Sequence, residues 1–132
     1  DVFGLIDAAL NGQAAHTQRM LEGLRGEGVE TPVILWALAR ELRLLATIAQ
    51  QVNQGMPLDK AFGSARPPVW DKRRPLVSKA LQRHSAAGWN RLLQDAQRID
   101  AQIKGQAAGD AWSALSRLAL LLAGQRLSLP SE

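Results

Sequence analysis

Histidine is the side chain most often used for acid–base catalysis and metal binding at neutral pH, and this sequence contains two, His16 and His84. They lie on separate stretches, and neither belongs to a ligand-spaced motif such as HExxH, so we expect ordinary surface or half-buried residues. The absence of cysteine excludes a thiolate nucleophile, a disulfide and a thiolate metal site. Serines are scattered without a nearby base, and no phosphate-binding glycine loop follows a strand. We therefore predict no catalytic residues, no metal and no cofactor, which indicates a domain that is not an enzyme by itself.

Glu41 is a carboxylate within an apolar stretch. Its neighbours at helical spacing are Ala37, Leu38, Leu44, Leu45 and Ile48. A buried carboxylate costs several kcal/mol unless it is paired and hydrogen-bonded, so Glu41 needs a cationic partner. The interpretation we favour is a buried ion pair with an arginine of a neighbouring helix. The alternative is an interface pair that another protein completes.

The segment from Lys60 to Arg83 is strongly basic, with Asp71 as its only acid. Its candidate contacts with DNA or a protein partner are Lys72, Arg73, Arg74, Lys79 and Arg83. Phosphate binding requires basic groups gathered on one face, and helical spacing scatters some of these, so we favour a solvated or protein-facing basic surface. Trp70 could stack on a nucleic-acid base, but next to Val69 we predict a core tryptophan.

The element that must position these residues is a long helix over Pro32–Asn53. Its apolar residues recur at three- and four-residue steps, and they are Ile34, Leu35, Leu38, Leu42, Leu45, Ile48, Ala49 and Val52. Trp36, Ala37 and Leu44 widen this face, so the helix must be covered on at least two sides. We expect Thr31 to cap its start, Pro32 to occupy its first helical position, and Gly55 and Pro57 to end it.

The rest of the chain predicts shorter helices packed against the long one. We expect helices over residues 1–10, 13–25 and 58–65, a kink or a fresh start near Pro75, and helices capped by Ser85 and Asp110. In the first helix the inner side is predicted to carry Val2, Phe3, Ile6, Ala9 and Leu10. Leu and Ala together are three times as numerous as Val, Ile and Thr, and no stretch alternates apolar with polar residues. The predicted fold is all-α: a single bundle of about six or seven helices around one long central helix.

Length and charge bound the organisation of the chain. Its 132 residues suit one domain, and no apolar run is long enough to span a bilayer, so we expect no membrane partner. Because it begins at Asp1 and already looks helical there, we expect a domain cut from a longer protein, and a reducing cytoplasm fits the lack of cysteine. Residues 1–58 carry four basic and six acidic groups, whereas residues 59–132 carry twelve and six. This asymmetry favours an anionic or acidic partner.

Several landmarks follow one another in a familiar order. They are Leu10-Asn11-Gly12, Leu24-Arg25 ahead of Glu27-Gly28, Arg40-Glu41-Leu42-Arg43-Leu44-Leu45, Val69-Trp70-Asp71-Lys72-Arg73, Lys79-Ala80-Leu81-Gln82-Arg83, and Ala111-Trp112 leading into Leu118–Leu122. Each motif alone is loose, but the order and separation together closely resemble the C-terminal domain of the delta subunit family of the bacterial DNA polymerase III clamp loader. The resemblance covers essentially the whole chain.

The resemblance implies a single C-terminal helical collar domain over residues 1–132, whose parent carries N-terminal ATPase-like domains that this sequence lacks. It implies assembly with the gamma/tau and delta-prime subunits into a pentamer, a grip on the sliding clamp through the absent N-terminal region, and primer-template DNA in the complex. The parent would be a subunit of DNA polymerase III holoenzyme, a nucleotidyltransferase complex, without hydrolysing ATP itself. We therefore expect a subunit-assembly domain that supports clamp loading in DNA replication. The alternative is a stand-alone helical nucleic-acid-binding domain that uses residues 60–83.

Overall fold

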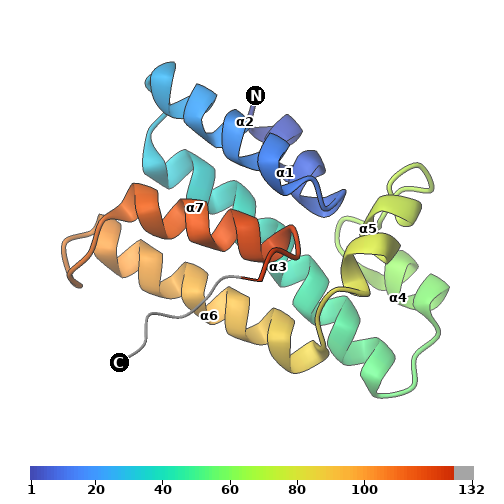
Figure 1. The fold of residues 1–132 in the computed structure, drawn as a ribbon. Coiled ribbons are helices and arrows are strands. Elements are labelled where there is room, and N and C mark those ends of the chain that lie inside the picture. Colours follow the sequence, from blue (N-terminus) through green and yellow to red (C-terminus); the bar gives the residue numbers. More distant parts are fainter. Residues whose placement is uncertain (127–132) are drawn as a thin grey trace.

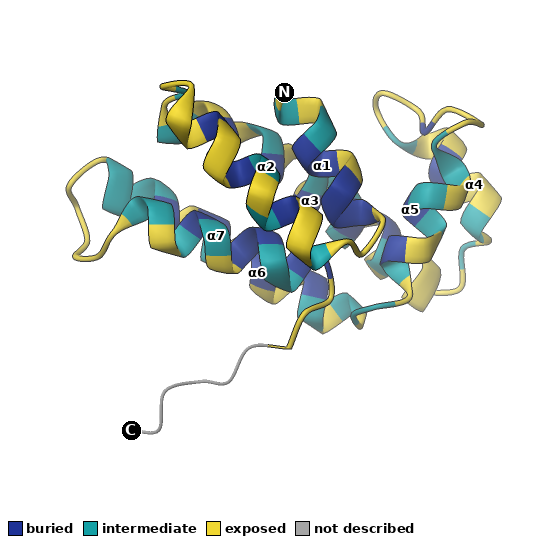
Figure 2. Cartoon of the chain, turned by 45° about the horizontal axis from the view of Figure 1, so that its top comes forward, coloured by how far each residue is buried: buried dark blue, intermediate teal, exposed yellow. Residues whose placement is uncertain are grey.

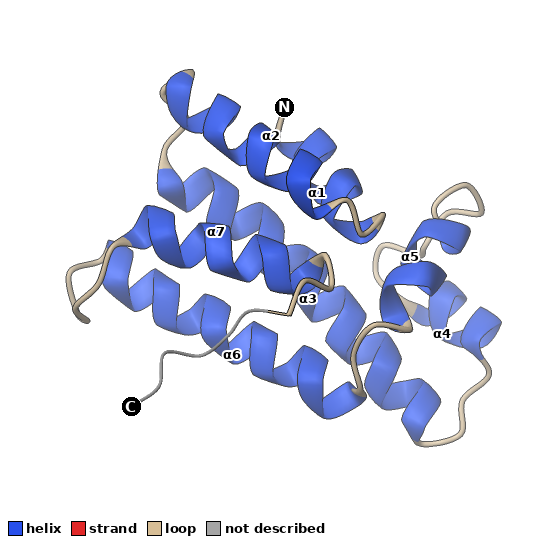
Figure 3. Cartoon of the chain, viewed as in Figure 1, coloured by secondary structure: helices blue, strands red, loops and turns tan. Residues whose placement is uncertain are grey.

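The computed structural model describes residues 1–126, and within them the chain forms seven α-helices and no strand (Figures 1 and 3). The helices are α1 (Val2–Leu10), α2 (Ala14–Gly26), α3 (Thr31–Asn53), α4 (Leu58–Ser64), α5 (Arg74–Leu81), α6 (Ala86–Ile103) and α7 (Ala111–Leu122). The predicted all-α fold with one long central helix is confirmed.

Helix α3 is the element that most of the others contact. It packs most extensively along α6 and also meets α1, α4, α5 and α7. As Figure 1 shows, α1 and α2 form an antiparallel pair on one side of α7, and α6 lies on the other side. The short helices α4 and α5 sit together at the far end of α3. The buried residues lie where these helices face one another (Figure 2). The largest of them are Leu5, Leu10, Ile34, Leu38, Leu42, Leu45, Ile48, Phe62, Trp89, Leu115, Leu118 and Leu122.

The ends of several helices agree with the sequence predictions. The Ser85 side chain accepts a hydrogen bond from the Gly88 amide at 3.0 Å and begins α6, and Asp110 accepts one from the Ser113 amide at 3.1 Å and begins α7. A fresh helix starts at Arg74, directly before Pro75. In α3 the predicted cap is wrong: Thr31 is already helical, Glu30 precedes it, and no side chain caps the helix.

Three large apolar residues predicted to face inward are exposed. Phe3 is 79% exposed and Trp36 is 65% exposed, and Val52 is also at the surface. In α1 the core side is formed by Leu5, Ile6, Ala8, Ala9 and Leu10, which leaves Phe3 on the same edge as Asp7, one turn away. In α3 the helices that cover it reach only part of its circumference, and Trp36 falls outside that arc. The prediction that these residues lie in the core is therefore wrong.

Surface ion pairs on α6 have helical spacing. Asp100 and Lys104 are 2.7 Å apart as an i,i+4 pair, and Asp95 pairs with Arg98 at 3.3 Å as an i,i+3 pair.

Candidate functional site

The basic segment forms a turn followed by α5. The Arg73 amide donates to the Trp70 carbonyl at 2.8 Å, which closes the turn over residues 70–73 immediately before the helix. Of the predicted contact residues, Lys72 and Lys79 are exposed, whereas Arg73, Arg74 and Arg83 are half-buried. These five residues therefore divide into two exposed lysines and three half-buried arginines.

Arg73 lies between α1 and α3. It donates a hydrogen bond from Nη1 to Asp7 Oδ1 at 2.9 Å, and its Nη2 lies 3.6 Å from Glu41 Oε1. The side chain of Glu41 is only 14% exposed, and its Oε1 makes no hydrogen bond within residues 1–126. Burial raises the pKa of Glu41 above its ordinary value, although the positive charge of Arg73 opposes the rise. The structure thus places an arginine beside Glu41, in an ion pair without a hydrogen bond.

Arg74 makes its contacts with the turn before α5 and with α4. Its Nε donates to the Val69 carbonyl at 3.1 Å and lies 3.4 Å from Asp71. The guanidinium also sits over the Phe62 ring, 5.5 Å from the centroid. These contacts tie the turn to α4 and leave Arg74 poorly placed for a phosphate.

Arg83 connects the α1–α2 turn with the C-terminal end of α7. Its Nη1 donates to the Ala9 carbonyl at 3.3 Å, and its side chain covers Gly12 and Gly124 so closely that a Cβ at either would lie 2.7 Å from it. Burial lowers the pKa of Arg83. This arginine therefore fixes the α1–α2 turn against the end of α7. It is not grouped with Lys72 on an outer surface.

Trp70 is the exposed residue of this turn, with 74% of its surface accessible. Val69 is buried instead, and its amide donates to the Phe62 carbonyl at 3.0 Å. Val69 is held on the inner side by this hydrogen bond, and Trp70, the first residue of the turn, lies on the outer side. The prediction of a core tryptophan is wrong. What the turn presents to solvent is an indole next to the exposed Lys72.

The two histidines take no part in this turn. His84 Nε2 lies 2.8 Å from the Leu121 carbonyl oxygen, and its ring meets Trp89 edge-on with centroids 4.7 Å apart. His16 is exposed on α2. Across residues 1–126 there is no group of three or more His, Cys, Asp or Glu side chains arranged to hold a metal ion. Nor does any described helix combine the length and apolarity needed to cross a membrane.

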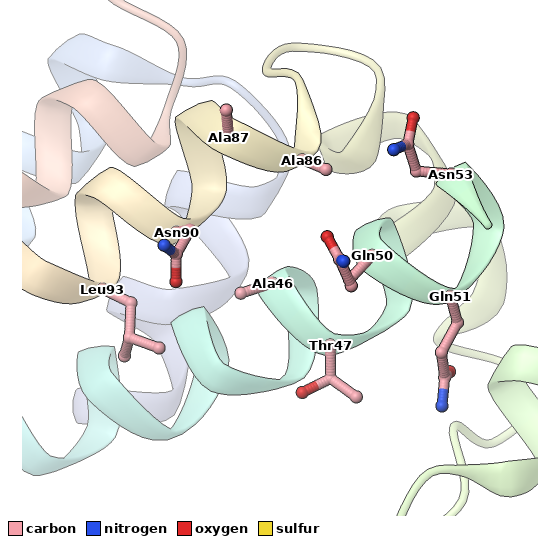
Figure 4. A pocket seen from close by; sticks show the side chains of 9 residues that line it. All are labelled: Ala46, Thr47, Gln50, Gln51, Asn53, Ala86, Ala87, Asn90 and Leu93. Atoms are coloured by element: carbon pink, nitrogen blue, oxygen red, sulfur yellow. The ribbon is translucent and has the colours of Figure 1, made fainter.

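A shallow groove of about 640 Å³ runs between α3 and the start of α6. Figure 4 shows its lining along the two helices: Ala46, Thr47, Gln50, Gln51, Asn53, Ala86, Ala87, Asn90 and Leu93. The lining contains amides, a hydroxyl and small apolar side chains, but no titratable group. Such a surface can hydrogen-bond and pack, but it offers nothing for acid–base chemistry.

The outer side of α3 was missed by sequence reasoning. Val33, Trp36, Arg40 and Arg43 are all exposed and follow one another at steps of three and four residues, which places them on one helix face. Arg40 and Arg43 form a polar row on this face. The signal available was that Val33 and Trp36 lie in line with that row rather than with the core residues.

The chain matches the sequence profile of a family described as the processivity clamp loader gamma complex DNA polymerase III C-terminal domain, over residues 2–129. It is 32% identical over 126 residues to DNA polymerase III subunit delta of Escherichia coli (strain K12), covering 96% of this chain and 36% of that protein. It is 28% identical over 124 residues to DNA polymerase III subunit delta of Haemophilus influenzae, covering 89% of this chain and 36% of that protein. The chain thus spans just over a third of the length of the relatives it matches. With a match over nearly its whole length, the chain belongs to the family of DNA polymerase III clamp-loader C-terminal domains.

Proposed function

We propose that this chain is the collar domain of a clamp-loader delta subunit, and that it assembles the loader rather than carrying out its chemistry. The observation that carries the proposal is the family match over residues 2–129, together with relatives named as subunit delta. An all-helical body whose outer residues include tryptophans and arginines suits a scaffold that meets other proteins.

In this role the domain joins the gamma/tau and delta-prime subunits in a heteropentamer. A preceding region of the parent protein grips the sliding clamp, and the assembled complex acts on primer-template DNA within DNA polymerase III holoenzyme in the cytoplasm. These partners follow from the family resemblance. The domain contributes the subunit contacts, and its parent supplies no nucleotide hydrolysis.

The test is reconstitution. The full-length protein that contains residues 1–132 is mixed with gamma/tau and delta-prime, and assembly is followed by sedimentation and by clamp loading on primed DNA. We expect one copy to enter a defined complex, and we expect loading to be lost when residues 1–132 are deleted. A deletion protein that assembles and loads clamps normally would refute the proposal.

The proposed contacts join unlike subunits, so the isolated domain has no reason to form a closed dimer with itself. We expect purified residues 1–132 to be monomeric, or to self-associate weakly, in light scattering over a range of concentrations. A tight homodimer that persists on dilution would count against a collar domain.

A DNA contact within the assembled loader has one specific observation in its favour, the exposure of Trp70 beside Lys72. An exposed indole stacks on bases without sequence preference, at about 1–3 kcal/mol per base. Since the arginines of the segment are engaged within the chain, we expect weak, non-specific affinity in the range of about 10⁻⁴–10⁻⁶ M for the isolated domain.

Anisotropy of labelled primer-template DNA measures this contact. Trp70→Ala should reduce affinity by about tenfold, whereas Trp36→Ala, the matched exposed tryptophan, should leave it unchanged. Nanomolar, sequence-dependent binding by the isolated domain would instead support an independent nucleic-acid-binding function.

A further inference from the structure

The outer side of α3 carries a row that we call the α3 stripe: Val33, Trp36, Arg40 and Arg43. Trp36 is 65% exposed and Val33 is 43% exposed, so the first two turns of the stripe present apolar surface to water. Exposed apolar residues that occur singly need no explanation. Here two of them share one face and are followed directly by two exposed arginines, and tryptophan and arginine are the residues most enriched where protein interfaces gain their affinity.

The two arginines of the stripe have no acidic partner in the described chain. Within residues 1–126, neither Arg40 nor Arg43 forms an ion pair, although Arg73, Arg74, Arg98 and Lys104 all do. Glu41 is adjacent to Arg40 in sequence, and the positive charge of Arg40 acts on it, but its ion pair is with Arg73. The stripe therefore offers two arginines that form no direct ion pair within residues 1–126.

The stripe continues into the groove between α3 and α6. Thr47 and Gln50 extend the same face beyond Arg43, and both line the groove that Figure 4 shows. The distance from Val33 to Gln50 along the helix is about 25 Å at 1.5 Å per residue. Small side chains at Ala46, Ala86 and Ala87 keep the far end of this surface open to the backbone of another helix. The whole surface thus has the length and shape to receive a helix of four to five turns.

We propose that the α3 stripe is the surface on which a neighbouring clamp-loader subunit docks, and that the partner presents an amphipathic helix with Asp or Glu beside its apolar residues. The inference rests on the proposed function and adds to it the surface and the chemistry of the partner. The apolar part of the partner covers Trp36 and Val33. Its carboxylates pair with Arg40 and Arg43, neither of which forms an ion pair within residues 1–126.

The test measures the dissociation constant of the full-length protein from the remaining loader subunits, for the wild type and two variants. Trp36→Ala should raise the constant by about 30-fold, the loss typical of a central interface tryptophan. The double reversal Arg40→Glu with Arg43→Glu should raise it at least tenfold, because like charges would then face each other.

Matched controls keep the test specific. Phe3→Ala removes another exposed large apolar side chain, from α1, and Arg91→Glu with Arg117→Glu makes the same change of net charge on α6 and α7. Both controls should stay within about twofold of the wild type. Because all the substituted side chains are exposed or half-exposed, far-ultraviolet circular dichroism should show unchanged folding for every variant.

The dependence of assembly on ionic strength measures the contribution of charge separately from that of packing. Raising the ionic strength should weaken wild-type assembly more steeply than assembly of the neutral variant Arg40→Gln with Arg43→Gln. If the wild type assembles and the stripe variants match it, the stripe is not the interface and the inference is wrong, while the proposed function stands. If the wild type itself does not assemble with the other subunits, the proposed function fails with it.

Discussion

Replacing Arg73 by methionine should destabilise the domain mainly through the carboxylate that it leaves behind. Arg73 is the positive group beside Glu41, whose side chain is 14% exposed, and it also pairs with the half-exposed Asp7. Loss of the Asp7 pair costs about 0.2–1 kcal/mol, as for an exposed pair. Leaving Glu41 covered and without its counter-charge adds about 1–3 kcal/mol. We therefore expect Arg73→Met to lower the free energy of unfolding by about 2 kcal/mol at pH 7.5.

Glu41→Gln should behave differently, because Arg73 keeps its hydrogen bond to Asp7. A fully buried pair broken on one side costs about 3–5 kcal/mol. Arg73 has a side chain that is 39% exposed and retains a partner, so the expected loss is below about 1 kcal/mol. In the double variant the carboxylate of Glu41 is also gone, so no covered charge is left without a partner. Its loss should be about 1 kcal/mol, smaller than that of Arg73→Met alone, which corresponds to a coupling of about 1.5 kcal/mol between the two positions.

The pH dependence has a definite sign. Burial raises the pKa of Glu41, so the folded state holds this proton more tightly than the unfolded state does. Stability therefore falls as the pH rises through the interval between the unfolded pKa and the raised folded pKa, and it recovers as Glu41 becomes protonated. Arg73→Met removes the charge that opposes the rise. Its destabilisation should be larger at pH 7.5 than at pH 5.

Urea denaturation followed by circular dichroism at both pH values measures all four proteins of the cycle. Arg98→Met is the control, because Arg98 is 69% exposed and Asp95 is only half-buried, so the pair should be worth less than about 0.5 kcal/mol. The reasoning is refuted if the two substitutions are additive. A greater loss at pH 5 than at pH 7.5 for Arg73→Met would refute it as well.

Four further substitutions test how the helices are stabilised. Gly23→Ala on α2, where a Cβ meets nothing within 4 Å, should raise the free energy of unfolding by about 0.5–1 kcal/mol in urea denaturation. An unchanged free energy of unfolding would contradict the expectation that glycine weakens α2 at this position. Gly12→Ala should lose more than about 1 kcal/mol, because Gly12 has a φ of +77° and its Cβ would lie 2.7 Å from Arg83; a neutral result would show that Arg83 moves aside. Ser85→Ala should lose about 1 kcal/mol with the cap of α6, whereas Leu45→Ala should lose about 2–5 kcal/mol in the core; thermal melting that ranks them the other way would contradict the packing described here.

Features that depend on nearby residues were predictable from the sequence. Ser85 and Asp110 cap helices through amides only three residues away, so the pattern contains both partners. The start of α5 beside Pro75 follows from the fixed geometry of proline. Glu41 could be singled out because a carboxylate among leucines is costly wherever the chain runs.

The partners of the basic segment could not be predicted, because they are distant in the sequence. Arg73 reaches Asp7 across 66 residues, and Arg83 reaches Ala9 across 74. Sequence spacing offers no signal for such contacts, so a cluster of charge looked like one basic surface. In the fold, Arg73, Arg74 and Arg83 contact residues of other helices or of the turn before α5. The exposed basic residues of the segment are Lys60, Arg66, Lys72 and Lys79.

The exposed tryptophans show that the hydrophobicity of a residue alone does not predict whether it is buried. Trp89 is fully buried, whereas Trp36 and Trp70 are largely exposed, although all three are the same type of residue. Their positions in the fold separate them. Trp89 lies on the buried side of α6, which packs along α3. The helices that cover α3 leave Trp36 exposed, and Trp70 begins the turn that follows the buried Val69. A chain that gains stability by burying indoles keeps two outside only at a cost in exposed apolar surface. Because the two lie on different elements, α3 and the turn before α5, contact with another subunit and contact with DNA can be altered separately.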